Sequence, residues 1–210
     1  DKMLVILPFE KKFYDEYDVE SHFVGHPLLD ELSNVKSINK KLFAKQNDLN
    51  PQKEIIALLP GSRKQEVSRM MEVMLKVVKI FPDYQFVIGC APSLPEEYYR
   101  ELVGDEDVHM VFNKTYQLLQ VASAAVVTSG TATLETALFY VPEVVCYKGN
   151  PISYFIAKKL IKVKYISLVN LIMNKAVVKE LIQNDLTAEN ISVELRQILS
   201  DTKRQRALLE

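Results

Sequence analysis

From residue 55 onward, the chain alternates short apolar runs with amphipathic segments. The apolar runs cover residues 55–59, 85–89, 108–112, 124–127 and 143–147. The segments between them place apolar side chains three or four residues apart, as on one face of a helix. Strands that alternate with helices at this spacing form βαβ units. The sequence therefore predicts an α/β fold with a Rossmann-like, doubly wound parallel sheet.

The flanking regions differ from this pattern. Residues 3–7 and 23–24 predict two short strands, which cannot make a domain alone, and a polar stretch follows them. We therefore expect residues 1–34 to be the end of an N-terminal domain plus a linker, and residues 35–210 to be a second domain. The polar stretch favours one short helix. Other helices are expected after each strand, and the C-terminal third is expected to hold helices without a further strand, with the expected helices at 40–46, 63–81, 95–103, 116–122, 152–161, 178–183 and 188–199.

Composition excludes several classes of protein. Lys+Arg 26 against Asp+Glu 27 leaves a net charge of -1, which argues against a nucleic-acid partner. Cys90 and Cys146 each end an apolar run and resemble buried small hydrophobic residues, which favours a reducing compartment. His22, His26 and His109 show no metal-ligand spacing, so no metal is predicted.

The run at residues 124–127 is followed by Thr128-Ser129-Gly130-Thr131 and then by helical spacing. Ser129 and Thr131 are candidate helix caps, and Gly130 lets the backbone approach a ligand closely. A helix that begins there presents unpaired N–H groups to phosphate. Glu135 cannot bind phosphate, but its carboxylate can accept hydrogen bonds from a ribose diol. An ordinary strand-to-helix turn with a solvated Glu135 accounts for the same spacing about equally well.

A second turn of this kind follows residues 55–59. Gly61 allows close approach, and Ser62 with Gln65 has the spacing of a capping box. Arg63, expected at the first helical position, can bind a phosphate through two parallel hydrogen bonds. The alternative is a solvated first-turn cation, which the helix dipole slightly disfavours. The GxGxxG, GxxxxGK[ST] and GxSxG motifs are absent, which weakens dinucleotide, P-loop and serine-hydrolase interpretations.

Five motifs taken together resemble the lipid-A-disaccharide synthase family. They read LVILPFE at 4–10, FVGHPL at 23–28, LLPGSR at 58–63, SGTATLE at 129–135 and YISLVNL at 165–171. The resemblance covers essentially the whole chain and corresponds to the C-terminal portion of that family. It implies a GT-B fold and inverting transfer of diacylglucosamine from UDP-2,3-diacylglucosamine to 2,3-diacylglucosamine 1-phosphate. It implies no cofactor and no metal.

The resemblance also implies roles for particular residues. The donor diphosphate is expected at the Gly-Ser-Arg turn and at the Ser-Gly-Thr turn, and the ribose at a glutamate. An asparagine and a following Glu-Leu-x-Gln segment complete the expected nucleotide site. The chain departs from the family pattern at two places near that asparagine, which alters the loop there. Val169 replaces the usual proline, and Met173-Asn174 replace a usual pair of small residues. The expected site residues are Gly61, Ser62, Arg63, Ser129, Gly130, Thr131, Glu135, Asn170, Glu180 and Gln183.

The same resemblance gives expectations about partners. The catalytic base and the acceptor site are expected upstream of Asp1, so this chain alone is predicted to be inactive. Lipid substrates imply a cytoplasmic protein peripheral on the inner membrane, and homo-oligomeric assembly stays open. Residues 152–164 combine apolar side chains with four lysines, which suits an anionic bilayer surface, although a helix packed on the sheet fits them equally well.

Two other interpretations remain. One is another GT-B enzyme that uses a UDP-sugar, such as an epimerase or a murein glycosyltransferase. The sequences Gly-Ser-Arg at 61–63 and Ser-Gly-Thr-Ala-Thr-Leu-Glu at 129–135 argue against both. The other is a non-catalytic UDP-binding module.

Overall fold

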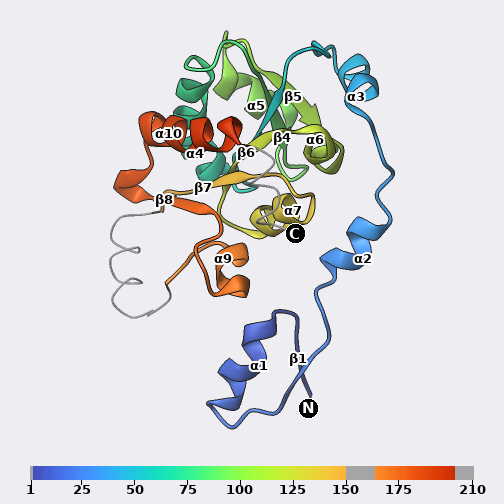
Figure 1. Cartoon of the computed structure of the whole chain (residues 1–210), viewed down its shortest axis with the longest axis vertical. Coiled ribbons are helices and arrows are strands. Elements are labelled where there is room, and N and C mark those ends of the chain that lie inside the picture. The colour runs from blue at the N-terminus through green and yellow to red at the C-terminus, as the bar shows by residue number, and fades with distance from the viewer. Residues whose placement is uncertain (1, 150–163, 202–210) are drawn as a thin grey trace.

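The computed structural model describes residues 2–149 and 164–201 and centres on a six-stranded sheet (Figure 1). All neighbouring strands in it pair in parallel, in the order β5-β4-β3-β6-β7-β8. The strands are β3 (Ile55–Leu59), β4 (Gln85–Cys90), β5 (His109–Phe112), β6 (Ala124–Thr128), β7 (Glu143–Tyr147) and β8 (Lys179–Ile182). The predicted α/β fold with a doubly wound parallel sheet is therefore confirmed.

Helices cover both faces of this sheet. On one face, the buried side chains of three helices pack against Ile56, Leu58 and Val126, whereas Ile55 and Ala57 pack against the helices of the other face. The helices of the first face are α4 (Lys64–Val78), α5 (Glu96–Val103) and α10 (Ala188–Ser200). Those of the second face are α3 (Lys40–Gln46), α6 (Thr115–Val121), α7 (Thr131–Leu138) and α9 (Leu168–Met173).

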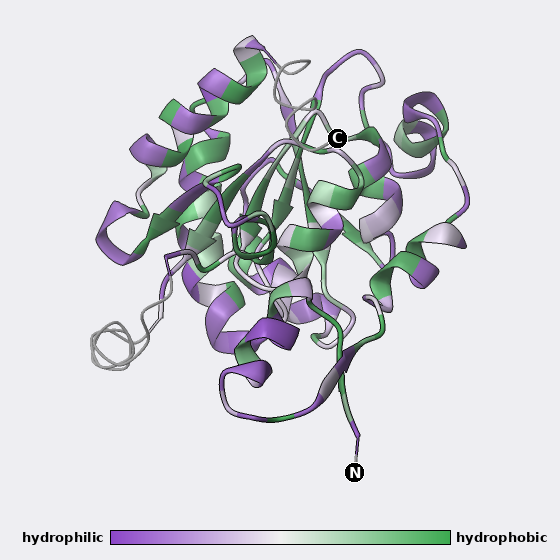
Figure 2. Cartoon of the chain, turned by 60° about the horizontal axis from the view of Figure 1, so that its bottom comes forward, coloured by the Kyte–Doolittle hydropathy of each residue, from purple (hydrophilic) through white to green (hydrophobic). Residues whose placement is uncertain are grey.

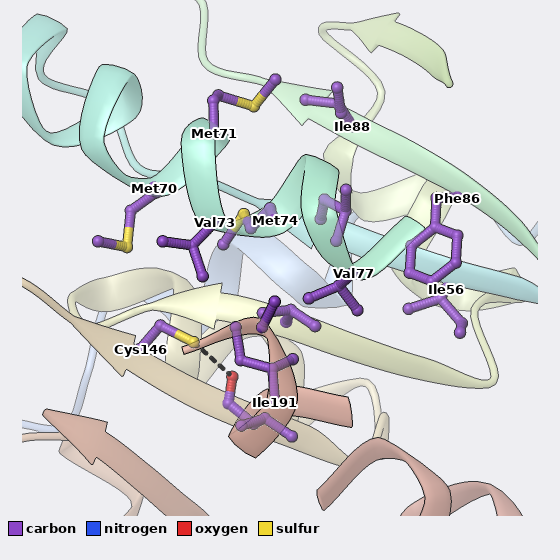
Figure 3. Packing of buried hydrophobic residues seen from close by; sticks show 14 of the residues in the cluster. Ile56, Met70, Met71, Val73, Met74, Val77, Phe86, Ile88, Cys146 and Ile191 are labelled. Atoms are coloured by element: carbon purple, nitrogen blue, oxygen red, sulfur yellow. Dashed lines mark hydrogen bonds between the residues drawn. The ribbon is translucent and has the colours of Figure 1, made fainter. Parts of the chain in front are cut away.

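Helix α4 contributes the largest apolar stripe to the core. Met70, Met71 and Met74 are each 1% exposed and belong to the cluster that also holds Ile88 of β4 and Ile191 of α10, with Met71 beside Ile88 (Figure 3). Unbranched methionine side chains fill the irregular space between a twisted sheet and a helix. Full burial of one such side chain stabilises the fold by roughly 1.5 to 3 kcal/mol. The same arrangement is visible in Figure 2, where apolar residues concentrate on the sheet and polar residues on the outer faces of the helices.

The C-terminal third differs from its prediction. Residues 178–183 were expected to be helical, but residues 179–182 form β8, whose Lys179 pairs with Val144 and whose Ile182 pairs with Tyr147 of β7. The apolar spacing of this segment suits either structure, and pairing with an otherwise open sheet edge decides it. A short 3-10 helix, η1 (Gln183–Asp185), then leads into α10, which matches the predicted helix at 188–199. The helix expected at 152–161 lies outside the described residues.

The segment that holds β1, α1 and β2 lies apart from the six-stranded sheet, at the bottom of Figure 1. In it, β1 (Met3–Val5) and β2 (Ser21–Phe23) pair in parallel around α1 (Pro8–Asp15), and α2 (Leu28–Ser33) follows. Helix α1 was not predicted; the Glu10 carboxylate stabilises its start by accepting from the N–H groups of Ile6 and Leu7. Leu4 is 60% exposed and Val24 is 58% exposed, so this pair of strands keeps an uncovered apolar surface.

Candidate functional site

The carboxyl ends of β3 and β6 form the topological switch point of the sheet. These strands pair in the middle, and the strand order runs in opposite directions on either side of them. Ligands of doubly wound sheets bind in the crevice at this position. The turn at 60–63 follows β3, and the turn at 129–130 follows β6, so both turns singled out in the sequence reach the same crevice.

A cavity of about 730 Å³ opens at this switch point. Its walls come from the carboxyl ends of β3, β4, β5 and β6 and from residues 34–36, which lie between α2 and α3. The expected site residues that line it are Gly61, Ser62, Ser129, Gly130, Thr131 and Glu135. The structure thus brings most of the expected residues into one cavity.

The N-terminus of α7 forms one wall of the cavity. Gly130 is the N-cap residue, and no side chain in the described ranges caps this helix. A Cβ atom at Gly130 would meet no other atom within 4 Å, so the space above the helix terminus is open. Unpaired N–H groups and the positive end of the helix dipole both favour an anion in that space.

Glu135 lies one turn further along α7, next to a second carboxylate. Burial, and then the charge of Glu31, raise the pKa of the Glu135 carboxyl above its ordinary value. The Tyr116 hydroxyl donates to Glu31 Oε1 at 3.0 Å, and burial and both carboxylates raise the pKa of this tyrosine. Glu31, Tyr116 and Glu135 together give the cavity an acceptor-rich side, which suits ligand hydroxyl groups.

Glu66 is a cavity residue that the sequence did not single out. Its carboxylate accepts from the Ser62 N–H at 3.1 Å and lies so close to Gly61 that any Cβ atom there would collide with it. The expected capping box of Ser62 and Gln65 is wrong, because Arg63 is the N-cap residue of α4 and Glu66 is the third helical residue. A glutamate at that position is the signal that could have identified it.

Arg63 does not line the large cavity. It borders a second cavity of about 340 Å³ on the α4 face of the sheet, together with Arg69 and Lys148. Thr128 and Glu66 line both cavities, so the two cavities are adjacent. Arg63, which was expected to bind the diphosphate, and the N-terminus of α7 therefore lie on opposite sides of the carboxyl end of β6.

The remaining expected residues lie outside the cavity. Glu180 of β8 accepts hydrogen bonds from the Ile166 N–H, from the main chain and hydroxyl of Ser167, and from Asn170 Nδ2, at 2.8 to 3.2 Å. Asn170 is 1% exposed and also bonds the main chain of Val178. These side chains hold α9 against β8, and Ser129 Oγ, which donates to Ile166 O at 3.0 Å, ties this network to the cavity.

Gln183 is the fourth expected residue outside the cavity, after Arg63, Asn170 and Glu180. It begins η1 with a left-handed φ of 54°, and its Nε2 is buried without a partner among the described residues.

Comparison with known proteins identifies the family. A family model described as lipid-A-disaccharide synthetase matches residues 1–208. The chain belongs to the lipid-A-disaccharide synthetase family. The family resemblance inferred from the five motifs is therefore confirmed, and the lipid-A-disaccharide synthases to which the chain is similar are glycosyltransferases.

Curated lipid-A-disaccharide synthases match this family member over its whole length. The enzyme of Syntrophus aciditrophicus (strain SB) is 41% identical over 219 residues, which cover 100% of the chain and 56% of that enzyme. The enzyme of Coxiella burnetii (strain Dugway 5J108-111) is 36% identical over 213 residues and is covered to the same extent, 56%. The chain thus spans about half the length of the curated relatives it matches.

Solved structures share the fold of this family member. UDP-GlcNAc 2-epimerase from Neisseria meningitidis, bound to UDP-GlcNAc, aligns with a TM-score of 0.65 at 14% identity, over 95% of the chain and 53% of the epimerase. WaaG, a glycosyltransferase involved in lipopolysaccharide biosynthesis, aligns with a TM-score of 0.55 at 13% identity, over 98% of the chain and 55% of WaaG. The fold is therefore the Rossmann-like C-terminal half of a GT-B fold with additional C-terminal helices.

Proposed function

We propose that the chain is the donor-binding portion of an inverting glycosyltransferase. The full enzyme would transfer diacylglucosamine from UDP-2,3-diacylglucosamine to 2,3-diacylglucosamine 1-phosphate, which forms the lipid A disaccharide. One observation carries the proposal for this chain: both small-residue turns and Glu135 line a single cavity at the switch point of the sheet. Family membership supplies the reaction and its substrates.

The proposed donor geometry follows from the chemistry of the cavity walls. The diphosphate of UDP lies at the N-terminus of α7, near Ser129, Gly130 and Thr131, where N–H groups and the helix dipole stabilise negative charge. The ribose diol donates to Glu135, whose raised pKa reflects burial and a neighbouring carboxylate. Arg63 approaches the diphosphate from the smaller cavity across Thr128. Gly61 and Ser62, with the Glu66 carboxylate beside them, form the opposite wall of the cavity.

The transfer is a displacement at the anomeric carbon of the donor. An acceptor hydroxyl forms the new glycosidic bond as the bond to UDP breaks, and the negative charge that develops on UDP is stabilised by α7 and Arg63. A general base must take the proton of the hydroxyl. We assign that base to the half of the enzyme that the chain does not span, so the 210-residue chain is proposed to bind UDP without catalysing transfer.

The remaining parts of the proposal concern organisation and location. Residues 1–34 are proposed to belong to the N-terminal domain and its linker, supported by the uncovered apolar surface of β1 and β2. The acyl chains of both substrates favour a cytoplasmic enzyme peripheral on the inner membrane. Among the described residues, no helix is long and apolar enough to cross a bilayer.

Turnover and binding measurements test this proposal together. Titration calorimetry of UDP against the chain should give saturable 1:1 binding. Disaccharide formation should require a separately expressed N-terminal half. Formation by the chain alone would contradict the placement of the base. UDP binding with no transfer by the recombined halves would favour a non-catalytic UDP-binding module.

A further inference from the structure

The smaller cavity, on the α4 face, carries an excess of positive charge. Arg63, Arg69 and Lys148 line it, and Glu66 is the acidic residue among its described lining residues. None of these three cations forms an ion pair with another described residue. Lys64 also borders the cavity. Its ammonium group makes a cation–π contact with Tyr98, at 5.0 Å from the ring centre.

The position of these cations is electrostatically unfavourable without an anion. Arg63 is the N-cap of α4, at the positive end of the helix dipole, and Arg69 and Lys148 add further positive charge to the same cavity. The single Glu66 carboxylate, which accepts from the Ser62 N–H, offsets only part of this charge. An anion in the cavity would relieve the repulsion between the cations.

A buried hydroxyl provides an independent indication of a ligand. Thr128, the last residue of β6, is 3% exposed, and its Oγ1 has no hydrogen-bond partner among the described residues. Side chains alternate along a strand, and Ala124 and Val126 face the cluster that contains α4, so Thr128 lies on the α4 face as well. Its unpaired hydroxyl therefore borders the cationic cavity. A buried hydroxyl without a partner is costly, and a ligand oxygen would satisfy it.

We propose that this cavity binds a phosphate monoester carried by a second sugar, held by Arg69, Lys148 and the Thr128 hydroxyl. The cavity of about 340 Å³ adjoins the large one through Thr128 and Glu66, so both ligands can be bound side by side. Identification of that ligand as the acceptor sugar, through its 1-phosphate, rests on the proposed function, and it extends to this chain an acceptor site that the resemblance placed upstream. The binding of a phosphate monoester itself does not rest on it.

Binding of glucosamine 1-phosphate, measured by titration calorimetry with and without saturating UDP, tests the proposal. We expect Arg69→Ala and Lys148→Ala each to weaken its binding about fivefold or more, and Thr128→Val, which keeps the side-chain shape, to weaken it severalfold. UDP affinity should change less than about twofold in Arg69→Ala and Lys148→Ala, because neither residue lines the large cavity. Lys76→Ala, at the far end of α4 and paired with Glu72, is the matched control and should change neither.

Each other outcome would overturn the proposal. If the three variants weaken UDP as much as the sugar phosphate, the cavity is part of the donor diphosphate site. If they leave sugar phosphate binding unchanged, the cations are solvated surface groups. If inorganic phosphate binds as tightly as glucosamine 1-phosphate, the cavity does not recognise a sugar phosphate. Because the sugar phosphate titrations without UDP do not depend on the donor site, they stay interpretable even if that site is disproved.

Discussion

The carboxylate of Glu180 accepts two hydrogen bonds from Ser167, one from the main-chain N–H at 2.9 Å and one from the hydroxyl at 2.8 Å. It accepts a further bond from the buried amide of Asn170 at 2.9 Å. The sequence resemblance assigned Glu180 and Asn170 to nucleotide binding. From these contacts we predict that both are positioning residues, which fix the segment behind the Ser129 turn.

Removal of this carboxylate should therefore destabilise the fold. Glu180→Ala leaves donors of Ser167 and Asn170 without an acceptor in the protein interior. We expect a loss of about 2 to 4 kcal/mol in the free energy of unfolding. Urea denaturation measures it, and Glu189→Ala on the exposed first turn of α10 is the control. A loss no larger than that of the control would show that the network does not hold this segment.

Glu135 is predicted to recognise the ribose of UDP. Glu135→Ala should weaken UDP roughly tenfold or more, because hydrogen bonds to a charged group contribute about 1.5 to 3 kcal/mol. Pyrophosphate, which has no ribose, should bind as before. Titration calorimetry with UDP, uridine and pyrophosphate measures these effects, with the exposed Glu97→Ala on α5 as the control. Unchanged UDP affinity would mean that Glu135 is an ordinary helix residue at the cavity edge.

Arg63 is predicted to act on the diphosphate. Arg63→Ala should weaken UDP and pyrophosphate alike, and the difference from the parent chain should shrink as salt is raised, because part of the interaction is Coulombic. Lys79→Ala at the other end of α4, where Lys79 pairs with Glu106, should leave both affinities unchanged. A variant that binds pyrophosphate normally at low salt would remove Arg63 from the donor site.

Glu143 is predicted to make stability depend on pH. It is 2% exposed, both of its carboxylate oxygens lack a partner in the described part of the chain, and burial raises its pKa well above the ordinary value. As pH rises, the Glu143 carboxyl therefore loses its proton at a lower pH in the unfolded chain than in the folded chain. The contribution to stability is complete below pH about 4.5 and is lost progressively as pH rises toward the folded-state pKa, by at most about 1.4 kcal/mol per pH unit.

Thermal midpoints between pH 5 and pH 8 measure this loss. We expect the midpoint of the parent chain to fall over this range and that of Glu143→Gln to fall less, because the amide does not titrate. Glu135→Gln is the matched variant. The pKa of Glu135 is also raised, so its contribution to the pH dependence of stability must be measured separately from that of Glu143. Parallel pH profiles of the parent and Glu143→Gln would disprove the prediction.

Most of the sheet follows from local sequence, whereas parts of the site do not. Strands such as Ile55–Leu59 and Glu143–Tyr147 match their predictions because strands buried on both faces need continuous apolar runs. Residues 178–183 were predicted as a helix because their spacing is ambiguous, and only the distant β7 makes them a strand. By contrast, the turns at Gly61 and Gly130 could be predicted from the residues on either side of them.

The position of Arg63 and the roles of Glu66 and Thr128 could not be read from the sequence. Arg63 lies on the α4 side because the chain enters that helix one residue later than expected. The closeness of Glu66 to Gly61 depends on a side-chain rotamer. The unpaired hydroxyl of Thr128 becomes apparent only when every neighbouring element is in place.

The central pairing of β3 with β6 has a consequence for how the molecule folds. Ile56 lies beside Ala124, although the whole β4–β5 portion separates them in sequence. Closing so long a loop costs chain entropy before any contact compensates for it, so this pairing is expected to form slowly. The ligand crevice sits on this pair and is therefore absent from any early, locally structured intermediate. A nucleotide added during refolding should bind only after the slowest phase, and should slow unfolding without speeding folding.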